Sequence, residues 1–195
     1  MAIAMVINSC ILGGFLLLFA ADSLRLRRSG ALPAALERLG YAFLLLSLAL
    51  LAFAPRPSWP FGYQNAGRGS PAFTGIPAFI LAAGAIAGAS LLLWSVFLEF
   101  GWIRKKRKLR PEAIVDSGTY GLCRHPGFWW LTLLVVCLGL LKGVERYYIT
   151  MILMTALDFL LVFVQDRFIF PRVFPGYEEY RKRVPFLIPG KGLRN

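Results

Sequence analysis

The sequence is poor in residues that bind metal ions or form disulfide bridges. Among 195 residues there is one histidine, His125, and there are three cysteines, Cys10, Cys123 and Cys137. Three thiols cannot build a disulfide framework, and no two of them have the spacing of a metal motif. One histidine leaves too few of the usual ligands for a zinc or haem site. We therefore expect no metal site in this chain.

Acidic residues are also scarce, which leaves the chain strongly basic. Asp and Glu number 10 against 22 Lys and Arg, while 57% of the residues are hydrophobic and 16% are charged. The resulting charge of +12 is typical either of nucleic-acid binding or of the cytoplasmic face of a membrane protein. The basic residues cluster between apolar stretches, where anionic headgroups attract them. We therefore expect a lipid bilayer as a partner and no nucleic acid.

Five apolar stretches are predicted to cross a bilayer, which takes about 20 residues per helix. They are residues 3–21, 40–54, 77–97, 127–141 and 147–164. The first stretch lacks the basic start of a signal peptide, so we expect a retained helix. The predicted fold is all-α, a polytopic membrane helical bundle of about five transmembrane helices. Residues 1–100 hold the first three helices, and residues 101–195 hold a hairpin of the last two and a tail. Small residues in the third stretch allow close helix packing in lipid: Ala82, Ala83, Gly84, Gly88 and Ala89.

The positions of the basic residues predict the orientation. They are most frequent after the first, third and fifth stretches, so the positive-inside rule places the N-terminus outside and the C-terminus in the cytoplasm. The connection 55–75 then lies outside, with Trp59, Phe61 and Tyr63 at the headgroups. A composition heavy in Ala, Leu, Arg and Gly indicates a GC-rich prokaryotic genome, and hence the prokaryotic cytoplasmic (inner) membrane. The basic residues on the predicted inner side are Arg25, Arg27, Arg28, Arg38, residues 104–108, Arg110, Arg124, Arg167, Arg172, residues 181–183, Lys191 and Arg194.

Polar residues on the predicted cytoplasmic side fall in two segments, residues 112–126 and 164–189. The tight hairpin of the last two spans returns both segments to one face. We therefore expect Arg124, His125 and Asp166 to be neighbours.

Each of these features also has an ordinary structural interpretation. An Arg-His pair at a helix start commonly meets headgroups, and aromatic residues such as Trp129 and Trp130 form interfacial belts. Asp166 could simply pair with Arg167. Residues 178–183 could be a solvated amphipathic face. Asp158, inside the fifth span, is either bonded to a neighbouring helix or functional, because an intramembrane carboxylate is costly.

The joint pattern of the two segments resembles a membrane methyltransferase family, the isoprenylcysteine carboxyl methyltransferases and related phospholipid methyltransferases. The resemblance covers about the last 80 residues. It is carried by Ile114-Val115 with Gly118 and Tyr120, by Arg124-His125-Pro126-Gly127-Phe128, by Gln165-Asp166, by Phe174-Pro175-Gly176-Tyr177 with Tyr180, and by Arg183-Val184-Pro185.

The resemblance implies S-adenosylmethionine as cofactor, in a cytoplasmic pocket that the two segments close. Arg124 or a protonated His125 would meet the cofactor carboxylate. Asp166 would meet its ammonium or ribose hydroxyls. Tyr120 and Phe128 would face the adenine or the sulfonium. The implied cofactor-binding residues are Ile114, Val115, Tyr120, Arg124, His125, Pro126, Gly127, Phe128 and Asp166.

The chain departs from the family pattern at three positions. Phe128 stands where a Tyr is usual, and the usual acidic pair is reduced to Gln165-Asp166. Val162 occupies the position of an arginine that the family associates with the methyl acceptor. The acceptor therefore stays open among a prenylated cysteine carboxylate, a phospholipid amine, a small thiol and an isoprenoid-like lipid.

Three other classes of protein remain possible from the sequence. One is an NADPH-dependent reductase of the sterol-reductase type, which shares a similar terminal region. Another is a non-enzymatic protein that binds anionic lipid through its basic loops, with binding lost at high salt. A transport component is less favoured, because no inverted repeat is evident.

Overall fold

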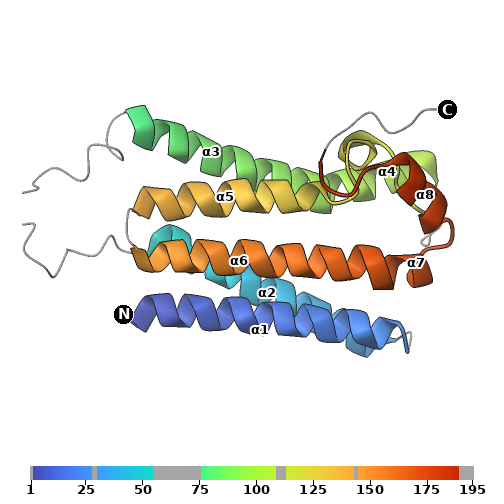
Figure 1. The fold of residues 1–195 in the computed structure, drawn as a ribbon, viewed down its shortest axis with the longest axis horizontal. Helices are drawn as coiled ribbons and strands as arrows, with labels where there is room; N and C mark the ends of the chain where they lie inside the picture. Colours follow the sequence, from blue (N-terminus) through green and yellow to red (C-terminus); the bar gives the residue numbers. More distant parts are fainter. Residues whose placement is uncertain (1, 28–29, 55–75, 109–112, 143–144, 189–195) are drawn as a thin grey trace, which may run out of the picture.

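The chain folds into a bundle of helices in the computed structural model (Figure 1), which describes residues 2–27, 30–54, 76–108, 113–142 and 145–188. None of the described residues forms a β-strand. The connection 55–75 lies outside the described residues, and so do the predictions made for Trp59, Phe61 and Tyr63.

Five long helices correspond to the five predicted spans. They are α1 (Ala2–Arg25), α2 (Ala31–Phe53), α3 (Ile76–Leu92), α5 (Pro126–Lys142) and α6 (Glu145–Val164). Together with the segments that extend them, α1, α2, α3 and α6 are long and apolar enough to cross a membrane, and α5 is a shorter apolar helix of 17 residues. The prediction of an all-α, integral membrane bundle is confirmed.

Two predicted boundaries were wrong because charged residues extend the helices beyond their apolar cores. Helix α2 begins at Ala31 instead of residue 40, since Glu37 and Arg38 are good helix formers. Pro33 is tolerated there because its first-turn position needs no backbone N–H donor. The third span continues through η2 (Leu93–Glu99) and α4 (Phe100–Arg107), and ends where Lys108 adopts a left-handed conformation with φ of 51°.

The remaining elements lie at one end of the bundle. They are η3 (Gly118–Gly121), η4 (Gln165–Ile169), α7 (Phe170–Val173) and α8 (Tyr177–Arg183). In Figure 1, α1 starts at the left end, whereas α4, α7 and α8 gather at the right end. We call this right-hand end the α8 end of the bundle. The segments η2 and η4 are π-helical, a distortion that is frequent near functional sites.

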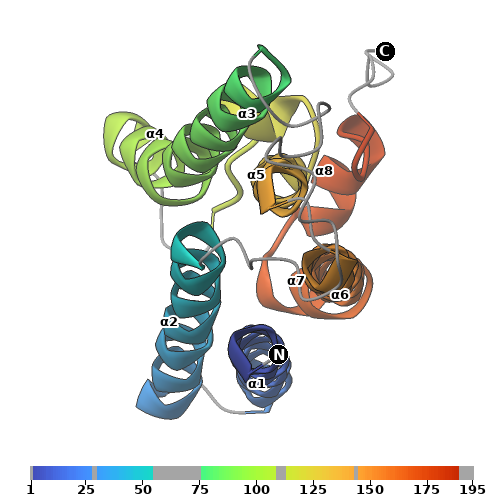
Figure 2. The ribbon, with the colours of Figure 1, turned by 90° about the vertical axis from the view of Figure 1, so that its left-hand side faces the viewer.

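The long helices form an open arc when the bundle is viewed along its axis (Figure 2). Helix α2 packs on α1, α1 on α6, α6 on α5, and α5 on α3. This order leaves α2 and α3 at the two ends of the arc. Residues from both α2 and α3, Leu44 and Leu92 among them, line a common cavity.

Glycines let two helix pairs approach closely. A Cβ at Gly14 of α1 would lie 3.0 Å from the Gly40 carbonyl oxygen of α2, and one at Gly40 would lie 2.9 Å from the Gly14 oxygen. A Cβ at Gly88 of α3 would lie 2.8 Å from the backbone nitrogen of Leu134 in α5. Small residues at helix crossings allow this approach in lipid. The expected role of the third span's small residues is thus confirmed for Gly88.

Candidate functional site

The two polar segments predicted to meet do so at the α8 end. The Arg124 backbone N–H donates to the Pro185 carbonyl oxygen at 3.0 Å. The Tyr180 hydroxyl donates to the Tyr120 carbonyl oxygen at 2.7 Å. The Trp129 indole donates to the Leu187 carbonyl oxygen at 2.7 Å. The loop before α5 and the tail after α8 are therefore held together by hydrogen bonds to backbone carbonyls.

Asp166 lies at the centre of this junction and is 5% exposed. Its Oδ1 accepts a hydrogen bond from the Tyr177 hydroxyl at 2.7 Å. The same oxygen lies 3.3 Å from His125 Nε2 and 3.3 Å from Arg124 Nε. On its other side, Oδ2 lies 4.0 Å from Arg181 Nε. The predicted proximity of Arg124, His125 and Asp166 is thus present, and Asp166 pairs with Arg124 instead of its neighbour Arg167.

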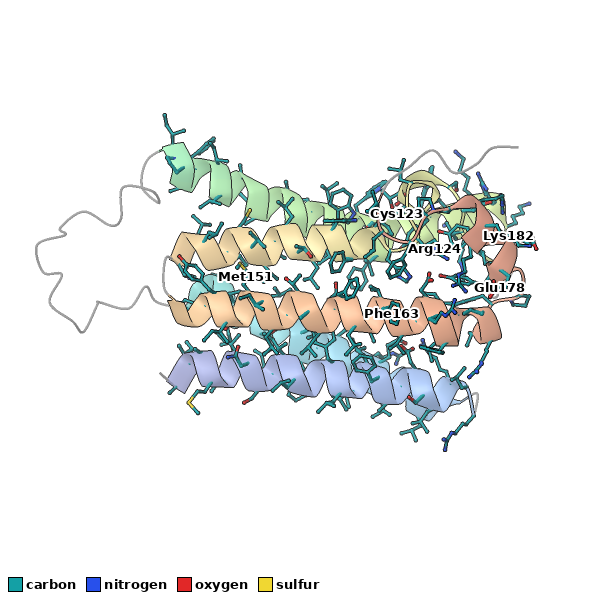
Figure 3. All side chains as sticks on the ribbon, in the orientation of Figure 1. Cys123, Arg124, Met151, Phe163, Glu178 and Lys182 are labelled. Atoms are coloured by element: carbon teal, nitrogen blue, oxygen red, sulfur yellow. The ribbon has the colours of Figure 1, made fainter. Side chains whose placement is uncertain are left out.

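Arg124 is buried without a full set of hydrogen bonds. Its side chain is 7% exposed, and its guanidinium lies 5.7 Å from the centre of the Phe186 ring. Its Nη1 atom is buried and has no hydrogen-bond partner among the described residues. Figure 3 places Arg124 at the α8 end, with Glu178 and Lys182 farther out. A buried guanidinium with spare N–H groups is suited to bind an anionic group of a ligand.

A cavity of about 550 Å³ opens beside these groups. That volume is within the range of small-molecule sites, about 300–1,000 Å³. All the predicted cofactor residues except Asp166 line it, and Asp166 contacts two of them. The lining residues that were predicted are Ile114, Val115, Tyr120, Arg124, His125, Pro126, Gly127 and Phe128.

Burial sets the protonation of the groups around Asp166. It lowers the pKa of His125 below the ordinary value of 6.5, and the hydrogen bond to Asp166 offsets this only in part. The imidazole is therefore neutral at pH 7, and a proton on Nε2 can be donated to Asp166. Burial and then Asp166 raise the pKa of Tyr177. Burial also raises the pKa of Tyr120 to about 12, so both phenols stay protonated.

Aromatic rings hold the His125 imidazole in place. The ring stacks on Phe170 at 5.7 Å and meets the edge of Phe186 at 5.3 Å between centroids. Phe170 in turn packs edge-on against Tyr177 at 5.5 Å. The rings of Phe170 and Phe186 thus enclose the His125 imidazole in an aromatic setting.

Glu99 of η2 is a buried residue of this region that sequence reasoning missed. Its carboxylate accepts the Thr119 backbone N–H at 2.9 Å and also the Thr119 hydroxyl. Gly118, at φ of +66°, lies against it, and a Cβ there would be 1.8 Å from Glu99 Oε1. The contact fixes the turn that brings Tyr120 to the cavity. The available signal was an acidic residue flanked by apolar residues just beyond the end of the predicted third span.

The N-terminal helices also contribute to the cavity wall, which the resemblance did not predict. Arg25 of α1 and Glu37 of α2 form an ion pair there. Asp22 of α1 accepts a hydrogen bond from Gln165 Nε2 at 2.9 Å, and so joins α1 to η4. The site is therefore built from the whole bundle and not from the last 80 residues alone.

The surface of α8 and the surroundings of Asp158 bear on two of the ordinary structural interpretations. The expected solvated face of α8 is present at Glu178, Glu179 and Lys182, whereas Arg181, which pairs with Glu178, also lies 4.0 Å from the buried Asp166. Asp158 forms no hydrogen bond or ion pair with the other described residues, and it lines the cavity.

Among the described residues, no group of three or more His, Cys, Asp or Glu side chains could hold a metal ion.

Comparison with known proteins returned a partial similarity. No family model and no solved structure matches the chain. Over 89 residues the chain is 37% identical to the cobalt-zinc-cadmium resistance protein CzcN of Cupriavidus metallidurans. The match takes in 43% of this chain and 39% of that protein, so the chain spans well under half of the length of the relative.

Proposed function

We propose that the protein is an S-adenosylmethionine-dependent methyltransferase of the membrane that acts on a lipophilic or small acceptor. The observation that carries the proposal is the incompletely paired guanidinium of Arg124, buried beside His125 and Asp166 on the wall of a cavity of about 550 Å³. The resemblance of these residues to the methyltransferase motifs supports the same proposal.

The residues on the cavity wall match the chemical groups of this cofactor. Arg124 offers free N–H groups to a carboxylate. Asp166 lies directly behind this wall, beside Arg124 and His125, and its Oδ2, 4.0 Å from Arg181 Nε, is offered to an ammonium or to ribose hydroxyls. Tyr120 and Phe128 line the cavity and provide aromatic faces. Such faces attract a sulfonium by about 0.5–2 kcal/mol.

The contribution of the chain to catalysis is then mainly positioning. The sulfonium supplies a methyl group that is already activated. The residues around Arg124 and Asp166 hold the donor, and the apolar wall excludes water. Alignment of this kind can lower a barrier by about 7–11 kcal/mol.

We further propose that the α8 end faces the cytoplasm of a prokaryotic cell. This end carries the basic last turn of α4 and the basic residues of α8. Short loops rich in Lys and Arg stay in the cytoplasm. Reporter fusions after residue 188 and within 55–75 test the orientation. Cytoplasmic activity of the second fusion would contradict it.

Isothermal titration calorimetry of the detergent-purified protein tests the cofactor. S-adenosylmethionine and S-adenosylhomocysteine should bind, and NADPH should not. His125→Ala and Asp166→Ala should each abolish binding in a folded protein, whereas Glu179→Gln, a change on the solvated surface of α8, should leave it intact. Unchanged affinity in both site variants, or binding of NADPH alone, would reject the proposal.

A further inference from the structure

Asp158 belongs to the face of α6 that lines the cavity. The residues of α6 on the wall are Met154, Asp158, Leu161 and Val162, followed by Gln165 in η4. Their spacing of three to four residues places them on one side of a helix. The carboxyl group of Asp158 is therefore on the cavity side, not the lipid side.

Asp158 lies deeper in the bundle than Asp166, the proposed cofactor residue on the same helical segment. The adjacent Phe159 ring is 6.0 Å from the Phe128 ring, in the first turn of α5. Asp158 is thus level with the start of α5. It is about 12 Å along the helix from Asp166, since eight residues separate them at about 1.5 Å each.

The other charged groups on the cavity wall have protein partners. Arg25 pairs with Glu37, and Arg104 donates to the Ala113 carbonyl oxygen at 3.1 Å. Arg124 lies 3.3 Å from Asp166. Within the described part of the chain, Asp158 alone among these wall charges forms no hydrogen bond or ion pair.

The wall around this carboxyl group is largely apolar. Leucines from three helices, Leu18, Leu44 and Leu131, line the same cavity. A carboxylate in such a setting is costly unless a cation or a hydrogen-bond donor meets it. An amine with an apolar chain can pair its ammonium group with the carboxylate and pack its chain against the leucines.

We propose that Asp158 binds the ammonium group of the methyl acceptor, and that the acceptor is a lipophilic amine. This inference rests on the proposed methyltransferase function and specifies its acceptor. A carboxylate acceptor is disfavoured, because its charge would face that of Asp158. Tyr41 of α2, which lines the same cavity, adds an aromatic face for a cation.

The proposal also gives Asp158 a role in proton transfer. Its carboxylate takes one proton from the bound ammonium, which frees the nitrogen lone pair. The nitrogen then bonds to the methyl carbon, while the carbon–sulfur bond breaks and leaves its electron pair on sulfur. The products are a methylated ammonium, a neutral thioether and a protonated Asp158, so charge and atoms balance.

Ligand binding tests the acceptor separately from the cofactor. The probes are dodecylamine and dodecanoate, titrated into the detergent-solubilised protein saturated with S-adenosylhomocysteine. Wild-type protein should bind dodecylamine about tenfold more tightly than Asp158→Asn does. Dodecanoate should bind more weakly to wild type than to the variant. Glu179→Gln serves as a control that keeps the charge change but leaves the cavity intact.

Three results would each contradict a different part of the proposal. Equal dodecylamine affinity in wild type and Asp158→Asn would overturn the role of Asp158, even if the cofactor binds. Tighter binding of dodecanoate than of dodecylamine by wild type would overturn the amine assignment. Failure of S-adenosylmethionine to bind either protein would instead reject the proposed function. Radiolabelled methyl transfer to dodecylamine, reduced at least about tenfold in Asp158→Asn with cofactor affinity unchanged, would support the proton-transfer role.

Discussion

The Tyr177 hydroxyl lies 2.7 Å from Asp166 Oδ1, the same oxygen that His125 Nε2 approaches at 3.3 Å. One short hydrogen bond therefore ties α8 to η4 at the point where the loop before α5 arrives. Both side chains are buried, Tyr177 at 4% exposure. Loss of this hydrogen bond should lower the stability of the tail and change the shape of the cavity.

Tyr177→Phe should lower stability by about 1.5–3 kcal/mol, the cost of removing one buried hydrogen bond to a charged group. Thermal unfolding in detergent measures the change. Tyr148→Phe is the control, because no hydrogen bond of the Tyr148 hydroxyl is found among the described residues of the bundle. A similar loss of stability in both variants would argue against a specific role for the Tyr177 hydroxyl.

Gly118→Ala should destabilise the turn that carries Tyr120. Gly118 has φ of +66°, and a new Cβ would lie 1.8 Å from Glu99 Oε1. The Glu99 carboxylate would have to leave Thr119, so we expect a loss above about 2 kcal/mol and weaker cofactor binding. Gly101→Ala is the control, since nothing lies within 4 Å of a Cβ added at Gly101. Thermal unfolding and calorimetry of both variants check the prediction.

Gly14→Ala and Gly13→Ala should differ sharply although they are neighbours in α1. A Cβ at Gly14 would lie 2.9 Å from Leu44 and 3.0 Å from the Gly40 oxygen, so α1 and α2 must separate. We expect a loss of about 1–3 kcal/mol. A Cβ at Gly13 meets Phe43 at 3.9 Å, an ordinary contact. That variant should be neutral or more stable by up to about 1 kcal/mol. Equal unfolding temperatures would contradict the close crossing.

The protein should lose stability as the pH falls below about 6.5 because of His125. Burial lowers the pKa of His125 in the folded chain, so the unfolded chain binds the proton first. The free energy of unfolding therefore rises with pH between the pKa of His125 in the folded chain and 6.5. Below the folded pKa, the whole loss of stability due to His125 has been reached.

His125→Gln should flatten this part of the stability profile. Unfolding temperatures at pH 7.5 and 5.5 are compared for both proteins, so that the other titrating groups cancel in the difference. An equally steep decrease in the variant would show that other groups cause the pH dependence.

Much of the bundle could be predicted from apolar stretches, because lipid requires long helices with satisfied backbones. The meeting of His125 and Asp166 also followed from topology, since a tight hairpin returns its two ends to one face. Helix ends were predicted less well. Charged residues such as Glu37 continue a helix when propensity is favourable, although they interrupt an apolar pattern.

The contacts of Glu99 and Asp22 could not be predicted in the same way. Each depends on which face of a helix meets a loop or a distant helix, and the apolar pattern of a membrane helix does not specify that face. Glu99 reaches Thr119, and Asp22 reaches Gln165. For Asp158 the sequence indicated that the residue was unusual, and its position on the cavity wall required the fold.

The carbonyl groups of Pro185 and Leu187, which receive the hydrogen bonds of Arg124 and Trp129, come after all five long helices in the chain. Ribosomes make a protein from its N-terminus, so these acceptors emerge after the five long helices. The helices therefore enter the membrane before the Pro185 carbonyl can accept the hydrogen bond from Arg124. Membrane insertion should therefore precede ligand binding, and chains that stall before the tail should accumulate as inserted but inactive protein.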